Sequence, residues 1–257
     1  MNNTGSRPPR AGQPSSDMVL AGRNALREAL SAEREIDKIF VKKGEKSPAL
    51  TRLLDEAAGR RIPVLFVTSE KLCDLAGTSA HQGVVTVLSA AAYSDVETML
   101  ALAAERGEPP LLILCDGIED PHNLGAVIRT AECAGAHGVI IPRRRAVGLT
   151  SVVAKASASA LARLPVARVA NLAATLDDLR ERGLWAYACD MGGTPCYSTD
   201  LRGPAVFVLG AEGAGISRLV REKCDFCVSV PLYGSVNSLN VSNAAAVILC
   251  EAARQRH

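Results

Sequence analysis

Polar, uncharged side chains are concentrated between residues 230 and 243, with hydrophobic stretches on either side. Buried amides and hydroxyls are costly unless they are hydrogen-bonded. Such a cluster at the entry to a hydrophobic helix therefore indicates a bound ligand or a tight internal hydrogen-bond network. The residues concerned are Tyr233, Ser235, Asn237, Ser238, Asn240, Ser242 and Asn243.

A second segment, LGAEGAGIS (209–217), follows a predicted buried strand and carries Gly210, Gly213 and Gly215. Such a turn lets a ligand approach the backbone closely. It lacks both the Gly-Lys-Ser/Thr ending of a phosphate-binding loop and the GxGxxG pattern. Glu212 in its middle would repel a phosphate and suits a cation better, for which Arg129 is the candidate. A plain turn with an exposed glutamate is the alternative.

The third segment is DGIEDPHNLGAVIRTAECAG (116–135), which predicts a helix over about 123–133 with one apolar face. Arg129 falls just beside that face, so its aliphatic stem can pack while its guanidinium reaches a site beyond the strand ends. Asn123 stands at the helix start, where its amide can cap the backbone or face a ligand. The alternative is a capped helix with a solvated arginine.

The sequence also excludes one way of holding an adenosine cofactor. A dinucleotide-binding or common methyltransferase unit needs a glycine-rich turn after its first strand and an acid after its second. Here the first strand ends in CDGIEDPHN, and the second is followed by Arg143, Arg144 and Arg145. We interpret this arginine triplet as an RNA phosphate contact, with a solvated loop as the alternative.

Two series of alternating strands and helices must position these segments, which predicts an α/β protein. We expect a disordered leader (1–17), a small α/β domain (18–90), a linker with one weak helix (91–110) and a larger α/β domain (111–257). In the small domain the patterns predict helices over 22–30, 47–59 and 70–75 and strands over 36–41, 62–67 and 83–88. In the large domain, strands are expected over 111–115, 138–142, 165–169, 184–189, 205–209 and 226–230, with a buried final helix over about 239–253.

Composition is that of a globular protein, with 48% hydrophobic and 22% charged residues and a net charge of +2. Residues 1–92 hold 13 Lys/Arg and 10 Asp/Glu, a net of +3. The uncharged stretch 226–250 contains proline, glycine and asparagines, which disfavour a membrane span. No signal peptide is visible, so we expect a soluble cytoplasmic protein with reduced thiols. The single CxxC pair, Cys224 and Cys227, has no partner pair at zinc spacing, so no metal site is expected.

At these three segments the sequence strongly resembles the SpoU/TrmH family of RNA 2′-O-ribose methyltransferases, part of the SPOUT class. The matching motifs are DPHNLGAVIRTAECAG, VLGAEGAGIS and VPLYGSVNSLNVS, in the family's order and spacing. LAGRNALREAL and HQGVV resemble the family's N-terminal substrate-binding domain, which is similar to a small RNA-binding ribosomal protein. Within the family, the likeness is greatest to members that methylate a guanosine of 23S ribosomal RNA.

The resemblance implies a parallel sheet whose C-terminal part forms a deep trefoil knot, a homodimer packed through that domain, an RNA substrate and S-adenosylmethionine as cofactor. The implied catalytic residues are Asn123, Arg129, Glu212, Ser238 and Asn240. The implied cofactor-binding residues are Leu209, Gly210, Glu212, Gly213, Val230, Leu232, Ser238, Leu239 and Asn240.

Arg129 is proposed as the base in this family, but arginine holds its proton far above neutral pH. We interpret it instead as a cation that orients the ribose hydroxyl and lowers its pKa, with Glu212 and Asn123 fixing its geometry. Methylation of tRNA or of another rRNA nucleotide is an alternative. So is a non-catalytic RNA-binding or ribosome-assembly protein, which the intact motif residues disfavour.

The sequence departs from the family pattern outside the motifs. Ser159 and Ala162 stand where relatives commonly have Gly and Glu, and Asn243 stands where a small apolar residue is usual. These departures bear on local structure near the site and on the substrate.

Overall fold

Each of the two series of strands and helices forms its own sheet with its own hydrophobic packing. The computed structural model describes residues 18–257, and the predicted leader 1–17 lies outside the described residues. Of the described residues, one compact unit contains 18–90 together with Thr150–Val152, and the other contains Ala91–Leu149 and Val153–His257. Among the described residues, no helix is long and apolar enough to cross a membrane.

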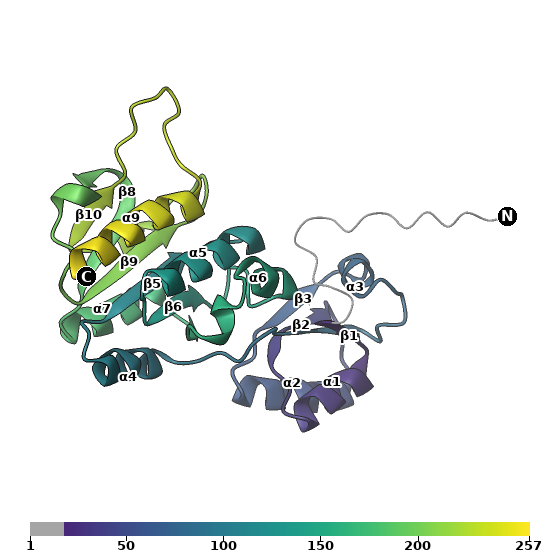
Figure 1. The fold of residues 1–257 in the computed structure, drawn as a ribbon. Helices are drawn as coiled ribbons and strands as arrows, with labels where there is room; N and C mark the ends of the chain where they lie inside the picture. Colours follow the sequence, from purple (N-terminus) through teal and green to yellow (C-terminus); the bar gives the residue numbers. More distant parts are fainter. Residues whose placement is uncertain (1–17) are drawn as a thin grey trace. The chain divides into compact units, whose positions relative to one another are not determined.

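The first unit is a four-stranded sheet in the order β1-β4-β2-β3, with β2 and β3 parallel and the other pairs antiparallel. Figure 1 shows α1 and α2 on one side of this sheet and α3 on the other. The elements are β1 (Val19–Ala21), α1 (Arg23–Ser31), β2 (Ile36–Lys42), α2 (Pro48–Gly59), β3 (Val64–Val67), α3 (Ser69–Ala76) and β4 (Val84–Leu88).

Hydrogen bonds join the two segments of this unit that carry the family resemblance. The backbone N–H and Nε of Arg23 donate to the side-chain and backbone oxygens of Gln82, both at 3.2 Å. The same guanidinium donates to Ser47 Oγ at 2.9 Å and to Glu45 Oε1 at 3.1 Å. Gln82 holds this position in the left-handed region, with φ 49°. The LAGRN and HQGVV segments therefore form one structural feature.

The second unit is a six-stranded parallel sheet in the order β10-β8-β9-β5-β6-β7, covered by helices on both faces. Alternate side chains of β5 enter two cores, one under α5 and α9 and the other under α4 and α7. The elements are α4 (Val96–Arg106), β5 (Leu111–Asp116), α5 (Pro121–Cys133), β6 (Gly138–Pro142), α6 (Ser151–Ala156), η2 (Ala160–Ala162), β7 (Val166–Val169), α7 (Leu172–Glu181), β8 (Trp185–Pro195), η3 (Cys196–Ser198), β9 (Ala205–Gly210), α8 (Arg218–Arg221), β10 (Phe226–Ser229) and α9 (Val241–Arg256).

The segment expected to be a linker belongs instead to this second unit. Its helix α4 buries Met99 completely among residues of β5 and β6. A Cβ atom at Gly138 would overlap the Met99 side chain, so the strand and the helix pack without a gap. The amphipathic pattern of α4 is weak because only a narrow face of the helix is covered.

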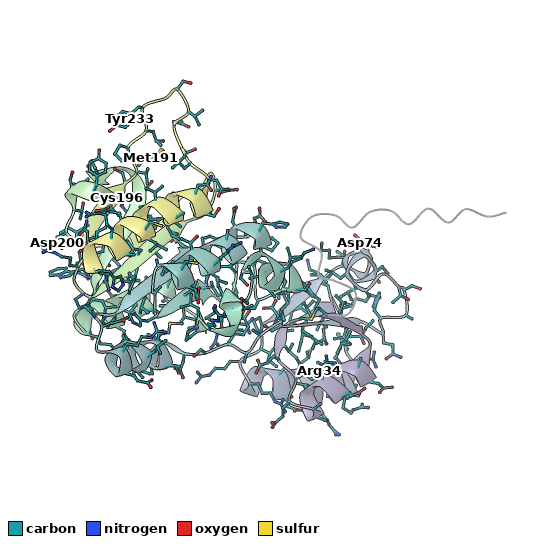
Figure 2. The ribbon with its side chains drawn as sticks, in the orientation of Figure 1. Arg34, Asp74, Met191, Cys196, Asp200 and Tyr233 are labelled. Carbon is teal, nitrogen blue, oxygen red and sulfur yellow. The ribbon has the colours of Figure 1, made fainter. Side chains whose placement is uncertain are left out.

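The final helix differs from the expectation of a buried helix. Its inner face, including Ile248 and Leu249, packs in the core, but Val247 on the other face is 43% exposed. The loop that precedes it protrudes and carries Tyr233, which is 91% exposed (Figures 1 and 2). At the helix end, Arg256 donates to the backbone oxygens of Leu201, Pro109, Pro110 and Gly203. This arginine fixes the end of α9 to the sheet, and burial lowers its pKa.

The departure at Ser159 has a physical consequence. Ser159 has φ 72° and follows Ala158 at φ 47°, so two consecutive residues with side chains occupy the left-handed region. That region favours glycine, the residue that the family resemblance leads us to expect at position 159. The turn between α6 and η2 therefore keeps the conformation that a glycine would adopt, at a cost in strain.

We predict that Ser159→Gly stabilises the second unit by about 0.5–1 kcal/mol, because relief of left-handed strain outweighs the added freedom of the unfolded chain. Urea unfolding followed by the fluorescence of Trp185, the single tryptophan, measures this unit. The control is Ala154→Gly within α6, which should destabilise by about 0.5–1 kcal/mol. Equal losses of unfolding free energy in the two variants would show that Ser159 is not strained.

Candidate active site

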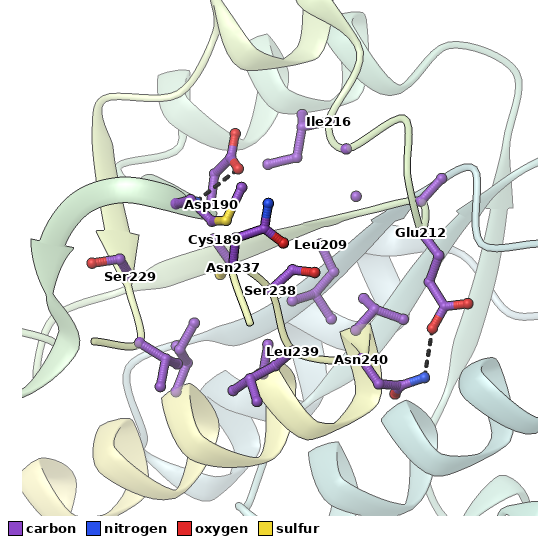
Figure 3. A pocket seen from close by; sticks show the side chains of 18 of the residues that line it. Cys189, Asp190, Leu209, Glu212, Ile216, Ser229, Asn237, Ser238, Leu239 and Asn240 are labelled. Carbon is purple, nitrogen blue, oxygen red and sulfur yellow. Dashed lines mark hydrogen bonds between the residues drawn. The ribbon is translucent and has the colours of Figure 1, made fainter. Parts of the chain in front are cut away.

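The carboxyl ends of β8, β9 and β10 open onto a cavity of about 560 Å³ (Figure 3). Ligands of open parallel sheets bind at this edge, and the volume lies within the range of about 300–1,000 Å³ usual for small-molecule sites. All the residues that the resemblance implies for cofactor binding line this cavity: Leu209, Gly210, Glu212, Gly213, Val230, Leu232, Ser238, Leu239 and Asn240.

The glycine-rich segment forms a tight turn whose two ends are hydrogen-bonded to each other. The N–H of Ala211 donates to the Gly215 oxygen at 3.0 Å, and the N–H of Gly215 donates back at 2.8 Å. A Cβ at Gly210 would overlap the Gly215–Ile216 peptide. The absence of a side chain at Gly210 therefore serves the packing of the turn, whereas the sequence suggested that it serves the approach of a ligand.

Asn240 connects the three motifs. Its Nδ2 donates to Asn123 Oδ1 at 3.0 Å and to Glu212 Oε1. Its Oδ1 accepts from the Ser242 N–H at 2.9 Å and from Ser242 Oγ at 2.6 Å, which caps α9. Asn123 is buried at the start of α5, so the cluster is anchored on the α5 side. Side chains from α5, the glycine turn and the start of α9 thus meet at one edge of the cavity.

Arg129 is not hydrogen-bonded to this cluster. It is exposed on α5, and within the described part of the chain no hydrogen bond or ion pair of its guanidinium is seen. The expected contact between Arg129 and Glu212 is absent there, because Glu212 is bound to Asn240 instead. The interpretation that Glu212 and Asn123 fix the geometry of Arg129 stays a prediction.

The arginine triplet follows β6 at the same edge of the sheet. Arg144 and Arg145 are exposed, whereas Arg143 Nε donates to the Arg168 oxygen at 3.4 Å. The Arg145 carbonyl lies 3.7 Å from where a Cβ of Gly117 would stand, and Ala211 Cβ lies 3.5 Å from that point. The backbone of the triplet is therefore adjacent to the glycine turn.

Family models match both parts of the chain. The SpoU rRNA Methylase family matches residues 110–250, and a model described as RNA 2′-O ribose methyltransferase substrate binding matches residues 19–94. YacO of Bacillus subtilis, named for the TrmH family of tRNA/rRNA methyltransferases, is 41% identical over 242 residues, which cover 94% of this chain and 96% of YacO. The chain belongs to the SpoU/TrmH family of RNA methyltransferases. A Staphylococcus haemolyticus member is 40% identical over 244 residues, covering 94% of this chain and 97% of its own.

Solved structures of SpoU/TrmH proteins confirm the expected fold class, an α/β protein with a parallel sheet preceded by a substrate-binding domain. The SpoU methyltransferase AviRb from Streptomyces viridochromogenes aligns with a TM-score of 0.60 and 27% identity, covering 93% of this chain and 89% of AviRb. AviRb in complex with the cofactor AdoMet aligns with a TM-score of 0.59 and 27% identity, covering 93% of this chain and 90% of AviRb.

One wall of the cavity in this SpoU/TrmH protein was not visible in the sequence. Cys189, Asp190 and Met191 line the cavity from β8, which was expected to end at residue 189 and continues to Pro195. Asn237 lines it as well and belongs to the polar cluster singled out in the sequence. The pair Gly192 and Gly193 was the available signal, because glycines within a strand mark an irregular pairing.

We predict that Gly210→Ala weakens binding of S-adenosylmethionine and destabilises the second unit by about 1–3 kcal/mol, because the new methyl group overpacks the turn. Isothermal titration and urea unfolding measure the two effects. Gly234→Ala is the matched control, since nothing lies within 4 Å of its Cβ position in the neighbouring loop. Normal stability of the Gly210 variant would contradict this description of the turn.

Proposed function

We propose that this protein transfers a methyl group from S-adenosylmethionine to the 2′-oxygen of a ribose in RNA, most specifically a guanosine of 23S ribosomal RNA. Its family membership carries the general statement that it is an S-adenosylmethionine-dependent RNA methyltransferase. The observation that carries the proposal is the meeting of Asn123, Glu212 and Asn240 at the edge of the cavity. The substrate-binding model matched by the first unit is described for RNA 2′-O ribose methyltransferases and supports the ribose as target.

The cavity fits S-adenosylmethionine in its chemistry. Apolar side chains suit the adenine ring, while amide and hydroxyl groups suit its polar edges and the amino-acid end. The apolar lining includes Leu209, Ile216, Val228, Val230, Leu239 and Ile248, and the polar lining includes Ser229, Asn237 and Ser238. AviRb, which binds AdoMet, has the same fold and is 27% identical.

The cofactor supplies an electrophilic methyl group on a positively charged sulfur. The protein must then hold a ribose 2′-oxygen in line with that methyl group and ease the loss of the hydroxyl proton. Asn240, Asn123 and Glu212 form a rigid edge on which the ribose is positioned. Arg129 acts as a cation that orients the hydroxyl together with an RNA phosphate and lowers its pKa, while keeping its own proton.

The RNA is bound by two surfaces. The first unit contributes basic residues, since residues 1–92 carry a net charge of +3. Arg144 and Arg145 are exposed beside the glycine turn and are placed to contact phosphates near the reacting ribose. Relatives are named for both tRNA and rRNA, so the proposal of ribosomal RNA rests on the sequence likeness described above.

The protein acts as a homodimer packed through its second unit. Large hydrophobic side chains are exposed on the loop before α9 and on α9 itself, which supports an interface through this C-terminal segment. They are Tyr233, Val236 and Val247, exposed by 91%, 70% and 43%. We propose that the same C-terminal segment forms the trefoil knot implied by the resemblance.

We predict that Arg129→Ala lowers methyl transfer by about 10²-fold or more while leaving folding and cofactor binding intact, because its guanidinium acts on the substrate alone. Arg129→Lys should fail as well, since a point charge does not replace a planar fork. Mapping 2′-O-methylated riboses in rRNA and tRNA from a deletion strain, with and without these variants, identifies the target.

Arg202→Ala is the control for these variants. Arg202 is exposed and pairs with Asp200 at 2.8 Å outside the cavity, so the control removes a surface guanidinium that is not part of the proposed site. It should support normal methylation. An Arg129→Ala strain with fully methylated RNA would refute the role of Arg129, and a site that maps to tRNA would replace the ribosomal target.

We predict that a fragment beginning at Ala91 folds and binds S-adenosylmethionine but loses most activity on ribosomal RNA. Its two cores contain residues of the second unit alone, and α4 must be included because Met99 is buried. The salt dependence of RNA affinity for fragment and full chain measures the contribution of the first unit. Equal affinities and equal salt slopes would show that the triplet Arg143–Arg145 and the second unit carry RNA binding.

A further inference from the structure

Strand β8 leaves its pairing with β10 at the cavity. Ala188 pairs with Cys227, but the next residue of β10, Val228, pairs with Thr194, so residues 189–193 are bypassed. Gly192 has φ 77°, and a Cβ at Gly193 would lie 2.6 Å from the backbone of Cys227. The two glycines therefore allow the excursion, which brings Asp190 to the cavity wall.

Asp190 is held in a defined position at this wall. Its Oδ2 accepts from Arg221 Nη1 of α8 at 2.9 Å, and its Oδ1 accepts from the Met191 N–H at 2.8 Å. Its backbone oxygen accepts from Cys227 Sγ at 3.8 Å, and Ser229 Oγ donates to the Gly193 oxygen at 2.7 Å. The carboxylate keeps free lone pairs, because each oxygen can accept two hydrogen bonds.

Asp190 and Glu212 are the acidic side chains among the described residues that line the cavity. Figure 3 shows them on opposite sides of it, with Cys189, Leu209 and Ser238 between. Glu212 is tied to the cluster that faces the reacting ribose. Asp190 therefore lies on the side of the cavity remote from that cluster.

We propose that the Asp190 carboxylate accepts hydrogen bonds from the ribose hydroxyls of the adenosine half of S-adenosylmethionine. The proposal rests on the proposed function and adds a residue to its cofactor site. An acid beyond the end of a parallel strand holds ribose hydroxyls in dinucleotide sites, and Asp190 occupies such a place after the paired part of β8.

The ion pair with Arg221 favours the ribose hydroxyls over the cofactor's ammonium group as the binding partner of Asp190. The guanidinium compensates the charge of Asp190, and both side chains are partly exposed, at 37% and 40%. A carboxylate whose negative charge is balanced by a guanidinium still has lone pairs that accept hydrogen bonds, but it attracts a further positive charge only weakly. It therefore suits neutral hydroxyl donors more than a second cation. The apolar neighbour Ile216 on the same wall suits the adjoining adenine.

The test is isothermal titration of the full chain and its Asp190→Asn variant with S-adenosylhomocysteine and with 5′-methylthioadenosine, which keeps the ribose but lacks the amino-acid end. We expect affinity for both compounds to fall about 10- to 100-fold, as for loss of hydrogen bonds to a charged group. The variant should melt within a few degrees of wild type, because an amide of the same shape keeps the packing.

Two control variants separate the effect of the Asp190 carboxylate on cofactor binding from the effect of its ion pair. Arg221→Gln removes the pair but keeps the carboxylate, and should change either affinity by less than about threefold. Asp200→Asn removes another arginine-paired carboxylate, at 2.8 Å from Arg202 and outside the cavity, and should change neither.

A loss with S-adenosylhomocysteine alone would overturn the proposal in favour of the ammonium group. Equal losses in Asp190→Asn and Arg221→Gln would overturn it in favour of the ion pair, and normal affinity of Asp190→Asn would overturn it outright. In these cases wild type binds and the proposed function stands. If the wild-type protein binds neither S-adenosylhomocysteine nor 5′-methylthioadenosine, both this proposal and the proposed function are overturned.

Discussion

The site depends on the side-chain amide of one residue. Asn240 donates to Asn123 and Glu212 and accepts from Ser242, so it joins α5, the glycine turn and α9 across 117 residues of chain. Only an amide supplies donors and an acceptor in this arrangement. Aspartate would place a second carboxylate against Glu212, and serine is too short to reach both partners. The cavity wall and the cap of the last helix are therefore fixed by the same group.

The parallel sheet makes this convergence possible, and most of the sheet could be predicted from the sequence. Each apolar run of the second series became a strand, because a strand buried on both faces needs a continuous run of hydrophobic residues. Parallel strands direct the following loops to one edge, so motifs far apart in sequence meet there. The resemblance to the family supplied the residues of the cavity, and the structure places all of the implied cofactor residues on its wall.

Features that depend on long-range partners were not visible in the sequence. The periodicity of β8 could not show that its pairing with β10 skips five residues, so the wall around Asp190 was missed. The charge of Glu212 suggested a cationic partner, but its hydrogen bond goes to a neutral amide. The apolar first half of α9 suggested burial, yet Val247 is exposed. In each case the residue could be identified from the sequence, but the residues that it contacts are determined by the tertiary structure.

The surroundings of Arg129 leave its guanidinium available for the role proposed for it. Glu132 stands three residues further along α5, where helix geometry would favour an ion pair with Arg129. Glu132 instead pairs with Arg163 from the turn after η2, at 3.5 Å. An arginine neutralised within the protein would have to break that pair before it could bind an RNA phosphate. By occupying Glu132, Arg163 leaves the guanidinium of Arg129 free for an RNA phosphate, as its proposed role as an orienting cation requires.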